Sequence, residues 1–123
     1  MMILSTILVA FVALEHVYIL ALEMFLWTSP RARKAFGTTS QFAEETKSLA
    51  ANQGLYNGFL AAGLIWGLLH PNAAFSFQLQ LFFLICVAVA AVYGSITAKK
   101  SILFVQGFPA FAAIIAVLAA HFI

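Results

Sequence analysis

The sequence predicts an all-α protein, an integral membrane four-helix bundle, and three observations lead to this prediction. Of the 123 residues, 64% are hydrophobic and only 8% are charged, which is too few charges to cover a water-exposed surface. Four apolar segments are each long enough to cross a hydrocarbon core of about 30 Å. All six Lys and Arg residues fall in two of the connections between these segments. We therefore expect a single transmembrane domain over residues 1–123, with spans at about 3–27, 50–69, 78–97 and 102–122.

The segment boundaries follow from local signals. The opening "MMILSTILVAFVAL" has no basic residue, so we expect a retained helix and not a signal peptide. Pro30 is expected to end this helix. Thr38 and Gln41 have the spacing of a capping box, which predicts that a helix leading into the second span begins near Phe42. "HPNAAFS" is expected to form a tight turn, and "AKKS" joins the last two spans.

The basic residues predict the orientation of the chain. The first connection carries four of them and the third carries two: Arg31, Arg33, Lys34, Lys47, Lys99 and Lys100. The positive-inside rule places both connections in the cytoplasm and both termini outside. The formal net charge of only +2 gives no reason to expect nucleic acid as a partner. The lipid bilayer is the partner that the composition predicts.

Four glycines predict close helix packing in the second span. Gly54 and Gly58 are four residues apart, as are Gly63 and Gly67. Small residues at this spacing let two helix backbones approach each other. The neighbouring helix belongs either to the same bundle or to a second copy in a homo-oligomer, and the sequence leaves both readings open.

Polar side chains inside the spans predict a site, because each must find a partner out of water and a carboxylate costs roughly 3 kcal/mol at a helix centre. Counting the helical rise from each span centre puts Glu23 at ~12 Å to the cytoplasmic side, Gln53 at ~10 Å and Asn57 at ~4–5 Å. All four spans contribute a polar group to this half. The candidate ligand-binding residues are Glu15, His16, Glu23, Asn52, Gln53, Asn57, Tyr93 and Gln106.

We expect Glu23, Asn57 and Gln106 to approach one another around a cavity that opens to the cytoplasm. Pro109 removes the backbone donor that the Val105 carbonyl would have used, which leaves a free oxygen near Gln106. Glu15, near the midplane, is expected to donate a hydrogen bond to a neighbouring helix. The competing interpretation is that such Asn, Gln and Tyr residues only hold helices together, at about 0.6 to 2 kcal/mol each.

No metal site is predicted, because the first span lacks the i, i+3 or i, i+4 ligand pair of helix-borne metal sites. No cofactor motif, nucleophile elbow or Cys pair is present in the sequence either. The sequence therefore names no catalytic residue and leaves enzyme activity undecided.

The stretches "ALEHVYILALEMFLW", "LAANQGLYNGFLAAGLIWG" and "ILFVQGFPA" together resemble the small bacterial four-helix membrane proteins of domain-of-unknown-function family 1304. The resemblance covers nearly the whole chain. It implies a bacterial inner-membrane location and four helices, and it supplies no activity. The residues that carry it are Glu15, His16, Glu23, Asn52, Gln53, Asn57, Gln106 and Pro109.

Three classes of function fit these observations. The first is the binding or transport of a small polar or cationic species through the cytoplasm-facing site, as intramembrane carboxylates do in carriers. The second is a membrane enzyme acting on an amphiphilic substrate, with Glu23 as acid or base. The third is a structural partner of another membrane protein. Binding or transport is the leading hypothesis, and transport by so short a chain requires an oligomer.

Overall fold

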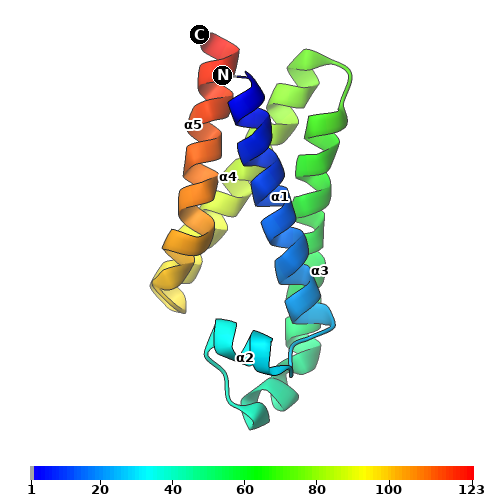
Figure 1. Ribbon diagram of the computed structural model, residues 1–123, viewed down its shortest axis with the longest axis vertical. Helices are drawn as coiled ribbons and strands as arrows, with labels where there is room; N and C mark the ends of the chain where they lie inside the picture. Colours follow the sequence, from blue (N-terminus) through cyan, green and yellow to red (C-terminus); the bar gives the residue numbers. More distant parts are fainter. Residues whose placement is uncertain (1) are drawn as a thin grey trace. The chain divides into compact units, whose positions relative to one another are not determined.

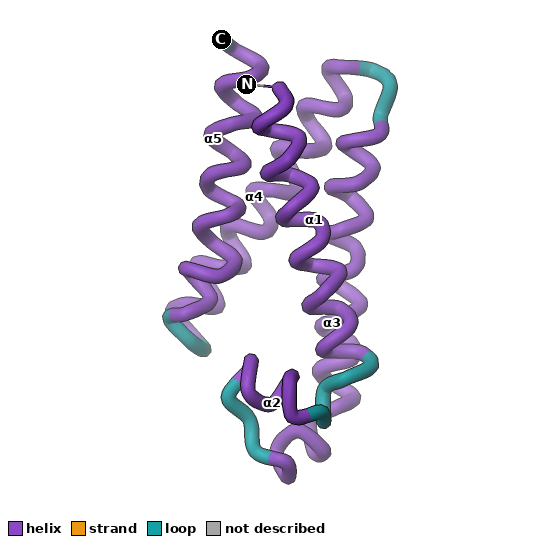
Figure 2. Tube along the Cα trace, viewed as in Figure 1, coloured by secondary structure: helices purple, strands orange, loops and turns teal. Residues whose placement is uncertain are grey.

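The computed structural model describes residues 2–123, so that Met1 of the predicted domain lies outside the described range. Within that range the chain is helical and contains no strand, which confirms the all-α prediction (Figure 1 and Figure 2). The elements are α1 (Met2–Met24), α2 (Pro30–Phe36), α3 (Ser40–Leu69), α4 (Ala73–Thr97), the π-helix η1 (Leu103–Gly107) and α5 (Phe108–Phe122).

Among the described residues, three stretches of helix are long and apolar enough to cross a bilayer. They are α1, with a mean hydropathy of 2.1, α4, with 2.2, and Leu103–Phe122, with 2.2. They correspond to three of the four predicted spans. The remaining span, at residues 50–69, is the second part of α3 and does not belong to this group. Its polar residues lower its hydropathy, so the membrane character of the protein rests on the other three helices.

The chain divides into two compact units, residues 1–14 with 60–123, and residues 15–59. The first unit holds a hydrophobic core in which side chains from four helices are buried. Its members are Val9, Val12, Ala13, Leu64, Leu84, Val87, Ala88, Ala110, Ala113 and Val117. Four of these ten side chains are alanine, a small residue that lets helices pack closely in a membrane. In this unit the first turns of α1 and the end of α5 lie at the same end (Figure 1).

The α3–α4 hairpin of the first unit is held by glycines and by polar caps. A Cβ atom added at Gly67 would lie 2.9 Å from Gln80 Cγ and 3.2 Å from Leu79 Cβ, so the two helices meet where no side chain stands between them. Ser76 Oγ donates to the Gly67 carbonyl over 2.6 Å, which satisfies one of the last carbonyls of α3. Asn72 caps the start of α4 by accepting from Ala74 N and Phe75 N.

The second unit corrects two predictions about helix ends. Pro30 does not end the first helix: α1 stops at Met24, and Pro30 opens the short helix α2, where a residue without an N–H is tolerated. Ser29 caps this helix by accepting from Ala32 N. The helix α3 begins at Ser40, and its capping hydroxyl is that of Thr39, which accepts from Phe42 N over 3.1 Å.

Thr38, the residue predicted to cap, has a buried hydroxyl without a partner within residues 2–123. It is drawn into the end of α2 instead, where Gly37 adopts a left-handed conformation with φ of 71° and Thr38 N donates to the Arg33 carbonyl. Gly37 therefore supplies the turn that separates α2 from α3.

Proline changes the helix type in the last span. The five residues before Phe108 form a π-helix, and Phe108 N–H reaches the Leu103 carbonyl, five residues back. Pro109 has no N–H to donate to the Val105 carbonyl. The irregular turn therefore occurs where the sequence predicts a free backbone oxygen.

Candidate functional site

Glu23 and Asn57 form a polar contact between α1 and α3 in the second unit. Asn57 Nδ2 donates to Glu23 Oε1 over 2.6 Å, from α3 to α1. The Glu23 side chain is 5% exposed and Asn57 is half-buried. This hydrogen bond bears out the expected approach of Glu23 and Asn57, while their approach to Gln106 around a cavity stays a prediction. The bond occupies one carboxylate oxygen and one amide hydrogen, so the oxygens Oε2 of Glu23 and Oδ1 of Asn57 can still accept from, or coordinate, a ligand.

Two glycines explain why this contact forms. A Cβ at Gly54 would lie 2.6 Å from Met24 Cγ and 3.0 Å from Glu23 Cβ, and a Cβ at Gly58 would lie 2.6 Å from Leu20 Cδ1. The backbone of α3 therefore touches α1 on both sides of Asn57. A short amide side chain can then reach the carboxylate directly, without a bridging water.

The four glycines of α3 thus contact different helices of the same chain. Gly54 and Gly58 pack against α1 in the second unit, while Gly63 and Gly67 pack against Phe83, Leu79 and Gln80 of α4 in the first. Of the two readings that the sequence left open, packing within the bundle is the one that these contacts support.

Glu15 and His16 lie two turns before Glu23 on α1. His16 is 1% exposed. Glu15 is half-buried, and its Oε1 is buried without a hydrogen-bond partner within residues 2–123. The hydrogen bond expected from Glu15 to a neighbouring helix is not formed by this oxygen and stays a prediction. The Asn57 amide bonds to Glu23.

The other predicted residues have different positions. Asn52 and Gln53 belong to α3 in the second unit, and both are exposed. Tyr93, on α4, is 69% exposed, and Gln106, in the π-helix, is half-buried; both belong to the first unit. Within residues 2–123, no group of three or more His, Cys, Asp or Glu side chains could hold a metal ion.

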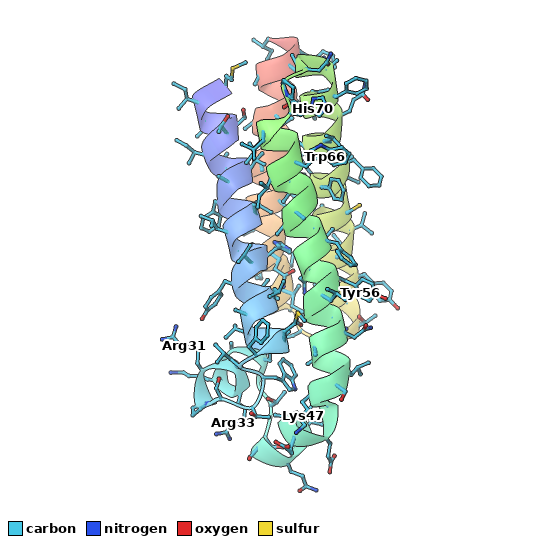
Figure 3. The ribbon with its side chains drawn as sticks, turned by 90° about the vertical axis from the view of Figure 1, so that its right-hand side faces the viewer. Arg31, Arg33, Lys47, Tyr56, Trp66 and His70 are labelled. Atoms are coloured by element: carbon cyan, nitrogen blue, oxygen red, sulfur yellow. The ribbon has the colours of Figure 1, made fainter. Side chains whose placement is uncertain are left out.

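The basic connection next to the Glu23 region is ordered by polar and aromatic contacts. Trp27 Nε1 donates to Thr46 Oγ1 over 3.0 Å, and its ring lies 4.9 Å from that of Phe36. Arg31 Nη1 donates to the Tyr18 hydroxyl over 3.3 Å, and this hydrogen bond raises the pKa of the fully exposed guanidinium. The side chain of Arg31 extends away from α2 (Figure 3). Arg31 therefore remains a permanent positive charge beside the end of α1.

Sequence reasoning missed two pockets of the first unit. One, of about 270 Å³, lies where the ends of α1, α4 and α5 meet, and its polar lining is Ser5, Thr6, Ser76, Gln80 and His121. The other, of about 570 Å³, lies on the α3–α4 hairpin and includes Trp66 and His70. Small hydroxyl residues and terminal histidines are too common near span ends to have indicated either pocket.

Comparison with known proteins gives a family. Residues 10–118 match the family described as "Protein of unknown function (DUF1304)". The chain is also 36% identical over 109 residues to the uncharacterized protein YpaA of Lactococcus lactis, a match that covers 87% of this chain and 90% of that protein. No solved structure matches. The matched range includes Glu23, Asn57 and all four glycines of α3, and the chain belongs to the DUF1304 family of proteins of unknown function.

Proposed function

We propose that this chain is a bacterial inner-membrane protein that binds a small polar or cationic species at Glu23 and Asn57 and, as an oligomer, transports it. One observation supports the proposal above all: Glu23 is 5% exposed, and its hydrogen-bond partner is the neutral amide of Asn57 at 2.6 Å. A contact that only held α1 to α3 would need no carboxylate, since two amides would do so without the cost of burying an acid.

The chemistry of the pair suits a cation or a ligand rich in hydrogen-bond donors. Glu23 Oε2 and Asn57 Oδ1 are both oxygens with lone pairs, and carboxylate and amide oxygens are hard ligands for small cations. The amide that donates to Oε1 fixes the orientation of the carboxylate. Glu15, whose Oε1 has no partner within residues 2–123, supplies a second carboxylate on α1, eight residues and about 12 Å of helical rise away.

A membrane orientation completes the proposal. We propose that residues 50–69 form a fourth span, that the two basic connections face the cytoplasm, and that both termini lie outside. The pair then belongs to the cytoplasmic half of the bilayer. The chain is too short for the internally repeated halves of most carriers, which is why transport is assigned to an oligomer.

Thermal unfolding of the purified protein in detergent tests the proposal. The chloride salts of lithium, sodium, potassium and ammonium and a short diamine are compared at constant ionic strength. We expect one of them to raise the Tm of the wild-type chain, because a ligand at one hundred times its Kd stabilises by about 2.7 kcal/mol. Glu23→Gln should abolish this shift.

Glu44→Gln is the matched control, since Glu44 is an exposed carboxylate paired with Lys47 at 2.6 Å. It should respond to the ligand as the wild-type chain does. A ligand that stabilised Glu23→Gln as strongly as the wild type would refute the site. Stabilisation by a second membrane protein alone would refute ligand binding and favour an assembly role.

A further inference from the structure

Arg31 and Lys34 are two exposed cations on one face of α2. They are three residues apart, which makes them neighbours on the surface of a helix. The opposite face of α2 is packed: Ala32 is fully buried, and the ring of the half-buried Phe36 lies 4.9 Å from that of Trp27. Packing of α2 through Ala32 and Phe36 therefore leaves both cations on the exposed face.

Neither of these cations has an acidic partner in the part of the chain that the structure describes. The ion pair found there joins Lys47 to Glu44 instead. Arg31 donates to a neutral group, the Tyr18 hydroxyl, over 3.3 Å. Two like charges at the spacing of Arg31 and Lys34 repel each other on a helix. An anion bound by both side chains would remove this repulsion.

The bond to Tyr18 fixes the level of the Arg31 guanidinium relative to the bilayer. Tyr18 belongs to α1, whose length and mean hydropathy of 2.1 suit a membrane span. It lies six residues before Met24, where α1 ends, which corresponds to about 9 Å of helical rise. Tyrosine rings near the end of a span sit at the level of the lipid headgroups. The Arg31 side chain, which extends outward beside this end of α1 (Figure 3), is therefore held at that level.

We propose that Arg31 and Lys34 bind the headgroup phosphate of one anionic phospholipid, with Tyr18 holding the guanidinium in place. A guanidinium has five N–H donors in a planar fork, and the bond to Tyr18 uses one of them, so others remain for two phosphate oxygens. The Lys34 ammonium supplies a second positive charge, which favours a headgroup without a cation of its own. The level of the site favours a lipid, because lipid phosphates already lie beside α1, whereas a soluble anionic partner would have to displace them.

Thermal unfolding with defined lipids tests the proposal. The protein in a neutral alkyl-glycoside detergent is titrated, at constant ionic strength, with phosphatidylglycerol or with phosphatidylcholine of the same acyl chains. We expect a saturable rise in Tm with phosphatidylglycerol and a several-fold weaker affinity for phosphatidylcholine. Arg31→Gln and Lys34→Gln should each weaken phosphatidylglycerol binding about fivefold, the loss expected for one cation at an anionic membrane surface. Both side chains are exposed, so neither change should prevent folding.

Two further variants separate a defined site from a general attraction of the lipid to positive charge. Lys100→Gln is the matched control, since it removes the same charge from an exposed side chain of the other basic connection, and it should leave the affinity unchanged. Tyr18→Phe keeps the ring and removes the hydroxyl. It should weaken phosphatidylglycerol binding about threefold, because the guanidinium is then no longer held in position before the lipid binds.

Several outcomes would overturn the proposal. These are equal stabilisation by phosphatidylcholine, an equal loss of affinity in Lys100→Gln and Arg31→Gln, or an unchanged affinity in Arg31→Gln, Lys34→Gln or Tyr18→Phe. A rise in Tm of the same size with an equal concentration of sodium phosphate would overturn it in favour of a soluble anion. Glu23→Gln should keep the response to phosphatidylglycerol, so that this site and the proposed Glu23 site are tested independently.

Discussion

Asn57 donates its side-chain amide to the Glu23 carboxylate over 2.6 Å, between two helices whose backbones Gly54 brings together. The bond pairs Glu23, a carboxylate that is costly inside a bilayer, with Asn57, an amide on the side of α3 that meets α1. It accounts for the burial of Glu23 in a segment without Lys or Arg. It also makes the stability of the second unit and the properties of the proposed site depend on the same two side chains.

The first prediction concerns the energy of this bond. Asn57→Ala should destabilise the protein by about 1–3 kcal/mol, because it leaves the buried Glu23 carboxylate without its donor. The double variant Glu23→Leu with Asn57→Leu should be less destabilised than the sum of the two single changes, with a coupling of about 0.6–2 kcal/mol. Denaturant or thermal unfolding of the wild type, Glu23→Leu, Asn57→Leu and the double variant in one detergent measures this coupling. Strict additivity would show that the bond contributes nothing to stability.

The second prediction concerns Gly54. Gly54→Ala should destabilise the protein by about 1–3 kcal/mol, because the added methyl group would meet Met24 Cγ at 2.6 Å and push α1 away from α3. Gly94→Ala is the control: its Cβ would lie 3.4 Å from Ile102, an ordinary contact, and alanine favours a helix. Opposite shifts in Tm are therefore expected from the same substitution at two positions. Equal shifts would show that α1 does not lie too close to Gly54 for an added methyl group.

The depths counted from the helical rise pointed to Glu23 and Asn57, but they did not put these two residues at the same level. The helical rise placed Gln53, and not Asn57, at the level of Glu23. The count treats each helix as straight and upright from an assumed centre, whereas the actual neighbours are decided by which face of α3 touches α1. Gly54 and Gly58 define that face; Asn57 lies at its edge and Gln53 points away and is exposed. The glycine spacing marks the face of α3 that packs closely, but the sequence does not say which helix packs against that face.

Helix existence was easier to predict than helix ends. Long apolar runs predict α1, α4 and the last span directly, since length and hydropathy decide whether a segment crosses a bilayer. The end of α1 and the start of α2 depend on competing local roles of one residue, because Pro30 can either stop a helix or open one. The choice between Thr38 and Thr39 as a cap depends on where Gly37 turns the chain. Such alternatives differ by about one hydrogen bond, which the sequence pattern does not resolve.

The third prediction concerns orientation. In a chain with Cys86→Ala, a cysteine introduced at Lys34 on α2 should be protected from a membrane-impermeant thiol reagent in whole cells, and one introduced at Pro71 should react. Both native residues are exposed, so accessibility reports the side of the membrane. A permeant reagent that labels both positions is the control for reactivity. Labelling at position 34 alone would reverse the proposed topology.

The last prediction compares the two carboxylates of α1. Glu15 Oε1 is buried without a hydrogen-bond partner within residues 2–123, whereas Glu23 accepts a hydrogen bond from Asn57. Replacing an unsatisfied buried polar group with an apolar group of similar shape is neutral or stabilising, so Glu15→Met should raise the free energy of unfolding by up to about 1–3 kcal/mol. Glu23→Met should lower it, because Asn57 then loses its acceptor.

The same thermal-unfolding assay measures both variants, and Glu15→Gln serves as the control. Glu15→Gln keeps a polar oxygen at the same place and should gain little stability. A loss of stability in Glu15→Met would mean that Glu15 has a favourable contact in the intact protein, which contradicts an unsatisfied carboxylate. If Glu15→Met is more stable but no longer shows the ligand-dependent Tm shift, then the chain keeps Glu15 at a cost to stability, which is the behaviour expected of a residue retained for function.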